Sequence, residues 1–199
     1  MRTKTKALAL ALCAVLLVVT TVFVTMAYLT STTDVVTNTF TVGKVTITLD
    51  EAKVDEYGKE VEGEDRVDAN TYKLIPGHTY TKDPTVHVTE GSENCWLFVK
   101  VENGLEDIID AETIGTQMSK NGWSLVDGET NIYAYSEIAT AETRDYKVFN
   151  NFKIKGEAAV DSYNNKNITI QAYAIQADGF ATAADAWAAA PSNWQTPAN

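Results

Sequence analysis

The segment that decides the fold reads Cys95-Trp96-Leu97-Phe98-Val99-Lys100-Val101-Glu102. Successive side chains of a strand point to opposite faces, so its two aromatic residues share one face, and its leucine and two valines share the other. A strand that is apolar on both faces has to be covered on both. We therefore predict a central strand over residues 95–102, with the rest of the domain built around it.

Short runs of β-type residues, separated by turn signals, lie on both sides of this strand. They cover residues 37–49 (with a bulge at Gly43-Lys44), 79–88 (with Pro84 at an edge or a break), 123–126, 132–135, 143–149, 151–155 and 167–177. Their apolar residues alternate with a period of two, which is typical of strands. Roughly eight to ten short strands with an inserted helix predict an all-β fold, a jelly-roll β-sandwich.

Three other segments carry helix, turn or loop signals. The apolar spacing of residues 105–120 predicts the inserted helix, and Asn121-Gly122 ends it. Thr182 is placed to cap a short helix over 183–189. Pro76-Gly77 predicts a type II turn, and the acidic stretch 50–68 predicts a solvated loop or hairpin tip.

The first 27 residues resemble a secretory signal. Three basic residues, Arg2, Lys4 and Lys6, precede an uncharged run over 7–27 that ends in Thr25-Met26-Ala27. We predict a signal helix within 1–27, cleavage between Ala27 and Tyr28, and a single sandwich domain over 28–199. An uncleaved membrane anchor is the alternative, because the uncharged run is long enough to span a bilayer.

Composition limits the classes of function. The chain has 16 basic and 27 acidic residues. Cleavage of the signal removes three basic residues, so the processed chain has a net charge of 13 − 27 = −14. This negative charge argues against nucleic-acid binding, and the signal is then the only predicted membrane contact. Cys95 is then the sole cysteine and opens an apolar run, so we predict a buried, unreactive thiol rather than an internal disulfide.

Several motifs together resemble the TasA and camelysin family. They are Met26-Ala27-Tyr28-Leu29-Thr30, Asn38-Thr39-Phe40-Thr41-Val42-Gly43-Lys44-Val45, Ile47-Thr48-Leu49-Asp50-Glu51, Leu74-Ile75-Pro76-Gly77 and Gln171-Ala172-Tyr173-Ala174-Ile175-Gln176-Ala177-Asp178-Gly179-Phe180. The resemblance implies a jelly roll that is exported by Gram-positive bacteria and trimmed by a signal peptidase of the endoplasmic-reticulum type. It also implies a subunit of extracellular biofilm matrix fibres, assembling with itself and with an accessory matrix protein as a further partner. In such fibres an amino-terminal strand completes the sheet of the next subunit.

Residues 28–42 would be that donor strand. They contain no proline and have alternating apolar positions, and cleavage frees their amino terminus. The assembly residues are Val35, Val36, Phe40 and Val42. The alternative is that this segment is simply the first strand of its own sandwich.

Two other classes of function stay open. The camelysin resemblance implies a cell-surface metalloprotease, but His-Glu-x-x-His is absent and only His78 and His87, with Glu90, offer ligands. We expect ordinary surface histidines and no catalytic, metal-binding or cofactor-binding residues. A monomeric surface adhesin would stack sugars on exposed aromatic residues. The candidates are Trp123, Tyr133, Tyr135, Trp187 and Trp194.

Cleavage after Ala27 can be tested directly. Amino-terminal sequencing of the protein secreted by its host is expected to start at Tyr28. A chain that keeps Met1 in the membrane fraction would show that the segment is an anchor.

Overall fold

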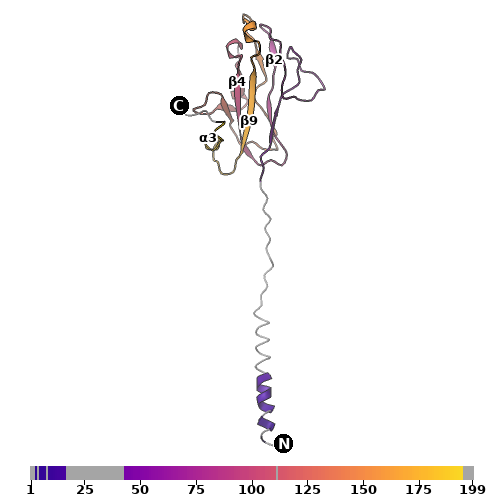
Figure 1. Cartoon of the computed structure of the whole chain (residues 1–199), viewed down its shortest axis with the longest axis vertical. Coiled ribbons are helices and arrows are strands. Elements are labelled where there is room, and N and C mark those ends of the chain that lie inside the picture. The colour runs from indigo at the N-terminus through magenta and orange to yellow at the C-terminus, as the bar shows by residue number, and fades with distance from the viewer. Residues whose placement is uncertain (1–2, 4, 8, 17–42, 111, 195–199) are drawn as a thin grey trace. The chain divides into compact units, whose positions relative to one another are not determined.

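The computed structural model describes residues 3, 5–7, 9–16, 43–110 and 112–194 (Figure 1). The chain forms two compact units, Met1–Thr41 and Val42–Asn199. Described residues of the first unit, 3, 5–7 and 9–16, are helical. Over the described ranges, no helix combines the length and the apolar character that a membrane crossing needs. The predicted cleavage site (Ala27, Tyr28) and the assembly residues (Val35, Val36, Phe40, Val42) lie outside the described residues.

The second unit consists mainly of antiparallel strands, which confirms the all-β class. The strands described are β1 (Ile47–Asp50), β2 (Thr79–Thr81), β3 (Thr85–Val88), β4 (Cys95–Asn103), β5 (Trp123–Leu125), β6 (Ile132–Tyr135), β7 (Asp145–Lys147), β8 (Asn151–Lys153) and β9 (Ile168–Gln176). They form sheets in the orders β1-β3-β7, β2-β8 and β5-β6-β4-β9.

The predicted central strand is confirmed. β4 pairs with β9 along its whole length, from Cys95 opposite Gln176 to Asn103 opposite Ile168, and with β6 on its other side. Figure 1 shows β4 and β9 side by side. Leu97, which is 1% exposed, belongs to one hydrophobic cluster, and Phe98 belongs to another. β4 is therefore covered on both faces, as its apolar pattern requires.

The larger cluster connects all three sheets. It contains Val86 of β3, Tyr146 of β7 and Phe152 of β8, together with the residues of β4 that share the face of Leu97. The rings of Tyr80 and Phe152 stack at 5.0 Å across the β2-β8 pair. One continuous core thus holds the sheets together.

The second cluster lies on the opposite face of β4 and is covered by α3 (Ala183–Ala188) (Figure 1). Trp187 places its ring 5.0 Å from that of Phe98. Thr182 caps the helix as predicted, and it forms a capping box with Asp185, which stabilises the first turn.

The predicted helix over 105–120 is wrong in its first half. The chain forms a 3-10 turn, η1 (Glu106–Ile108), and then a separate helix, α2 (Ile114–Lys120). Ile109 between them is extended and forms a β-bridge with Ile154, which interrupts the helical path. The predicted end is confirmed, since Gly122 follows α2 with a φ of +88°.

Several β-type runs differ from their predicted bounds, since β5, β7 and β8 are each shorter than the runs 123–126, 143–149 and 151–155. Of the run 37–49, residues 37–42 lie outside the described residues. Over 43–49 the strand begins at Ile47, and the backbone N–H of Thr46 bonds to the hydroxyl of Ser92. The run 79–88 divides into β2 and β3 on either side of residues 82–84, in agreement with the expected break at Pro84. The predicted turn at Pro76-Gly77 is confirmed, with Gly77 at a φ of +78°.

Removing side-chain volume from β4 tests the central role of this strand. Leu97→Ala is expected to lower the free energy of unfolding by about 2 to 5 kcal/mol, because it opens a cavity in the core. The matched control is Leu125→Ala on β5, where the side chain is 52% exposed and little should change. Urea unfolding of both variants gives the comparison, and equal losses would contradict this account of the core.

Candidate functional site

Two sheet edges lie next to each other without a described partner strand. β1 ends one sheet and β9 ends another, and each pairs on one side only within the described part of the chain. The strands approach each other closely along these edges. An edge strand presents backbone N–H and C=O groups that can pair with another strand.

A groove of about 820 Å³ opens beside these two edges. Its walls come from β1, β9, the segment 68–74, the end of β2 and the turn that contains η2 (Val160–Tyr163). Several apolar side chains line it, and they are Leu49, Tyr72, Leu74, Leu105, Phe152, Val160, Ile168 and Ile170.

The apolar wall of the groove is less completely buried than the core behind it. Ile168 and Ile170 point toward the main core from β9, yet both remain half-buried, and so does Leu49 of β1. In contrast, Val99, which lies on the neighbouring strand and contributes to the same core, is fully buried. The groove therefore offers apolar surface whose burial by another segment would be favourable.

Three polar residues form a contact network at the groove. The Lys82 ammonium lies 2.5 Å from one oxygen of Glu51, and the Asn70 amide donates to the other oxygen at 3.0 Å. Glu51 is 3% exposed and Lys82 is 9% exposed. Asn70 also replaces a strand neighbour, since it accepts from the N–H of Val54 and donates to the carbonyl of Ala52.

Tyr72 shows that this part of the groove is poorly solvated. Burial raises the pKa of its phenol well above the usual range, and the nearby negative charge of Glu51 adds to the increase. The hydroxyl donates to the carbonyl of Thr81 at 3.1 Å. Its ring packs edge-on against Phe152 at 5.5 Å.

A charged cluster borders the groove on the side of β1. Arg66 contacts the carboxylates of both Asp50 and Asp83, and it reaches the backbone carbonyls of both residues. Burial alone would raise the pKa of Asp50, but its hydrogen bonds to Arg66 and His87 outweigh that effect and hold the pKa below its usual value.

His87 bridges two strands of the three-stranded sheet. Its Nδ1 lies 2.7 Å from Asp145 of β7, and its Nε2 lies 2.9 Å from Asp50 of β1. Ionised carboxylates only accept hydrogen bonds, so both contacts are satisfied only by the doubly protonated imidazolium. Burial opposes this form, but the two carboxylates prevail and raise the pKa of His87.

The two histidines named for the metalloprotease alternative contact other groups in the structure. Both ring nitrogens of His87 contact carboxylates, whereas His78 contacts the carbonyl of Tyr57 and packs on Tyr80. Over the described residues, no group of three or more histidine, cysteine, aspartate and glutamate side chains is placed to hold a metal ion.

The remaining sequence candidates have mixed outcomes. Cys95 is buried as predicted, and burial raises the pKa of its thiol to about 11, so the thiol stays protonated at neutral pH. Two aromatic residues proposed as exposed sugar platforms, Trp123 and Trp187, are buried, because their indole N–H groups bond to Lys147 and Glu129 within the fold. Tyr133 is half-buried and lies against the core.

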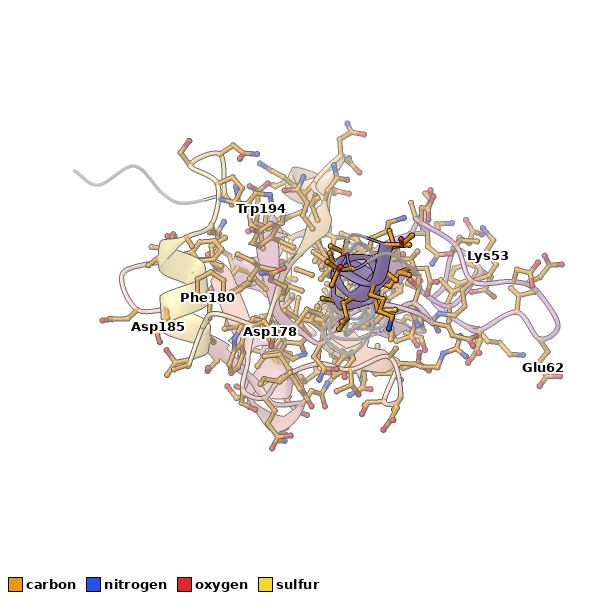
Figure 2. The ribbon with its side chains drawn as sticks, turned by 90° about the horizontal axis from the view of Figure 1, so that it is seen from below. Lys53, Glu62, Asp178, Phe180, Asp185 and Trp194 are labelled. Carbon is orange, nitrogen blue, oxygen red and sulfur yellow. The ribbon has the colours of Figure 1, made fainter. Side chains whose placement is uncertain are left out.

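The acidic segment 50–68 is solvated only in part. Figure 2 shows Glu62 at the tip of this loop, and its neighbours from Lys59 to Arg66 are exposed. The prediction is wrong for the start of the segment, where Glu51 is buried by its contact with Lys82. Composition could not reveal this, because the partner lies in a different part of the sequence.

The bridge at His87 predicts a specific pH dependence of stability. Because the folded pKa lies above 6.5, the contribution of His87 is fully present below pH 6.5 and is lost as the pH rises through the folded value. The lowered pKa of Asp50 adds a contribution that is present above pH 3.8 and is lost as the pH falls through its folded value.

His87→Gln should therefore reduce the fall in stability between pH 6 and pH 8. Asp145 is largely exposed, so solvent screening limits the effect to about 1 kcal/mol or less. His78→Gln is the control, since its ring contacts a carbonyl and no carboxylate. Urea unfolding across this range measures both, and identical profiles for wild type and His87→Gln would refute the bridge.

Comparison with known proteins adds no functional assignment. No protein-family model matches the chain, and no match was found among curated proteins or solved structures. The function of the groove is therefore inferred from its own features, which are two strand edges, an apolar wall and a buried polar network.

Proposed function

We propose that the groove accepts a β-strand from a second copy of this chain and that the protein is a secreted structural subunit of extracellular matrix fibres. The observation that carries this proposal is the pair of adjacent open edges, β1 and β9, beside a groove with an apolar wall. An added strand would pair with backbone groups of an edge and bury apolar side chains between the sheets.

The proposed occupant is the segment 28–42 of another subunit. In an extended chain Val36, Phe40 and Val42 share one face, and that face would lie against the wall formed by Ile168 and Ile170. The segment contains no proline and a single charged residue, Asp34, so nothing in it prevents continuous strand pairing.

This mode of binding produces a filament. A donor segment on one side of a subunit and an acceptor groove elsewhere make a heterologous contact, which extends without closing. Signal cleavage between Ala27 and Tyr28 would free the donor and start assembly outside the cell. The net charge of −14 on the processed chain would keep free subunits apart until strand exchange, so assembly should respond to ionic strength.

The proposal includes jelly-roll topology for the domain. The shared core of the three antiparallel sheets supports a sandwich in which one strand position is available to a partner. In this arrangement the subunit needs no catalytic residue, metal ion or cofactor for its role.

Removal of the donor tests the function. Deletion of residues 28–38 from the processed chain is expected to abolish fibres in electron micrographs, while urea unfolding of the domain stays close to wild type. Unchanged fibres would reject donor-strand assembly. Collapse of the domain on deletion would instead show that the segment is the first strand of its own sandwich.

A second pair of variants tests the groove. Ile170→Lys places a charge on the apolar wall and is expected to reduce fibre yield at least tenfold, because a buried unpaired charge costs several kcal/mol. The matched control is Leu125→Lys on β5, which lies at the other edge of the same sheet and is already exposed. Equal fibre yields from the two variants would show that the contact between subunits lies on another surface.

A further inference from the structure

Glu51 holds an amine and an amide on the two oxygens of one carboxylate. Lys82 Nζ contacts Oε2 at 2.5 Å, and Asn70 Nδ2 donates to Oε1 at 3.0 Å. The lysine follows β2, the asparagine belongs to the segment 68–74, and the glutamate follows β1. Residues from three parts of the chain thus bring an amine and a side-chain amide to the same carboxylate.

The pair lies in a buried part of the groove. Glu51 and Lys82 are almost completely buried, and Tyr72 and Phe152 pack nearby at the same groove. Burying a carboxylate and an ammonium together is costly even when they form a pair. Transfer of a proton from Nζ to Glu51 removes both charges and leaves the amine unprotonated, which is the form that attacks a carbonyl.

The Asn70 amide is oriented and polarised for attack. Its Oδ1 accepts a hydrogen bond from the backbone N–H of Val54 at 3.0 Å. Its Nδ2 donates to the carbonyl of Ala52 at 2.8 Å as well as to Glu51. The N–H of Val54 can stabilise the negative charge that develops on Oδ1 in a tetrahedral intermediate, as an oxyanion-hole donor does.

We propose that Lys82 and Asn70 become joined by an intramolecular isopeptide bond, with Glu51 as the general base and acid. Nζ gives a proton to Glu51 and attacks Cγ of Asn70, forming the Nζ–Cγ bond. The carboxylic acid of Glu51 then delivers a proton to Nδ2, and the Cγ–Nδ2 bond breaks with loss of ammonia. The regenerated carboxylate takes the second proton from Nζ, which leaves a neutral amide, and ammonia carries that proton away as ammonium. No oxidant, reductant or other reactant takes part, and the net change is the loss of one ammonia molecule.

The bond has a structural consequence within the domain. It replaces a buried ammonium by a neutral amide and closes residues 70–82 into a covalent loop that includes the Pro76-Gly77 turn. This loop carries Tyr72 and Leu74 of the groove wall, so the crosslink would stiffen one side of the groove. The chemistry depends only on contacts within one chain and stands whether or not the groove accepts a strand.

Peptide mapping of the folded, full-length protein tests the proposal. After denaturation, trypsin should release 67–73 and 74–82 as separate peptides from an unlinked chain. The crosslinked chain resists cleavage after Lys82, so both peptides should be missing. In their place we expect one branched species, 67–73 joined to 74–100, lighter than the two peptides by one ammonia, with the branch between Asn70 and Lys82 in its fragment spectrum.

Three variants and a control separate the roles. Lys82→Met, Asn70→Ala and Glu51→Gln should each restore the full mass and lose the branched species. The control, Lys147→Met, removes a lysine that pairs with Asp83 next to the site, and it should keep the branched species. Circular dichroism verifies that each variant is folded.

Each contrary result is decisive. Separate 67–73 and 74–82 peptides of unaltered mass from the wild type would overturn the proposal and leave Lys82 and Glu51 as an ion pair. Loss of water in place of ammonia would place the bond between Lys82 and Glu51 and would overturn it as well. A branched species that persists in folded Glu51→Gln would reject the role given to Glu51.

Discussion

The structure depends on one strand that carries buried apolar side chains on both faces. β4 has apolar side chains on both sides, so the fold has to supply a layer on each. The main core, with residues of all three sheets, covers the side of Leu97, and α3 covers the side of Phe98. β4 lies inside its sheet, between β6 and the edge strand β9.

The same arrangement leaves β9 with a free side. β9 pairs with β4 on one side, and no described strand pairs with its other side. β1, which also lines the groove, likewise pairs with a described strand on one side only. A soluble domain usually protects such edges with charges, bulges or a covering segment. Here Arg66 and its two aspartates lie at one end of the groove, while the wall formed by Ile168 and Ile170 stays apolar.

Local patterns could predict most strands but not the site. β6 has the predicted bounds, β4 ends one residue later than predicted, and β9 is one residue shorter at each end. These strands could be predicted because alternation and flanking turns are properties of a short segment. The helix over 105–120 was mispredicted because Ile109 pairs with Ile154, a contact between distant residues. The groove and the contact of Glu51 with Lys82 likewise depend on which segments meet, which no period in the sequence reveals.

The covering of the second face by α3 bears on the order of events during synthesis. α3 is the last helix described, so Trp96 and Phe98 lack the cover of Trp187 until residues 183–188 have left the ribosome. The chain therefore cannot complete its second core before residues 183–188 have been synthesised.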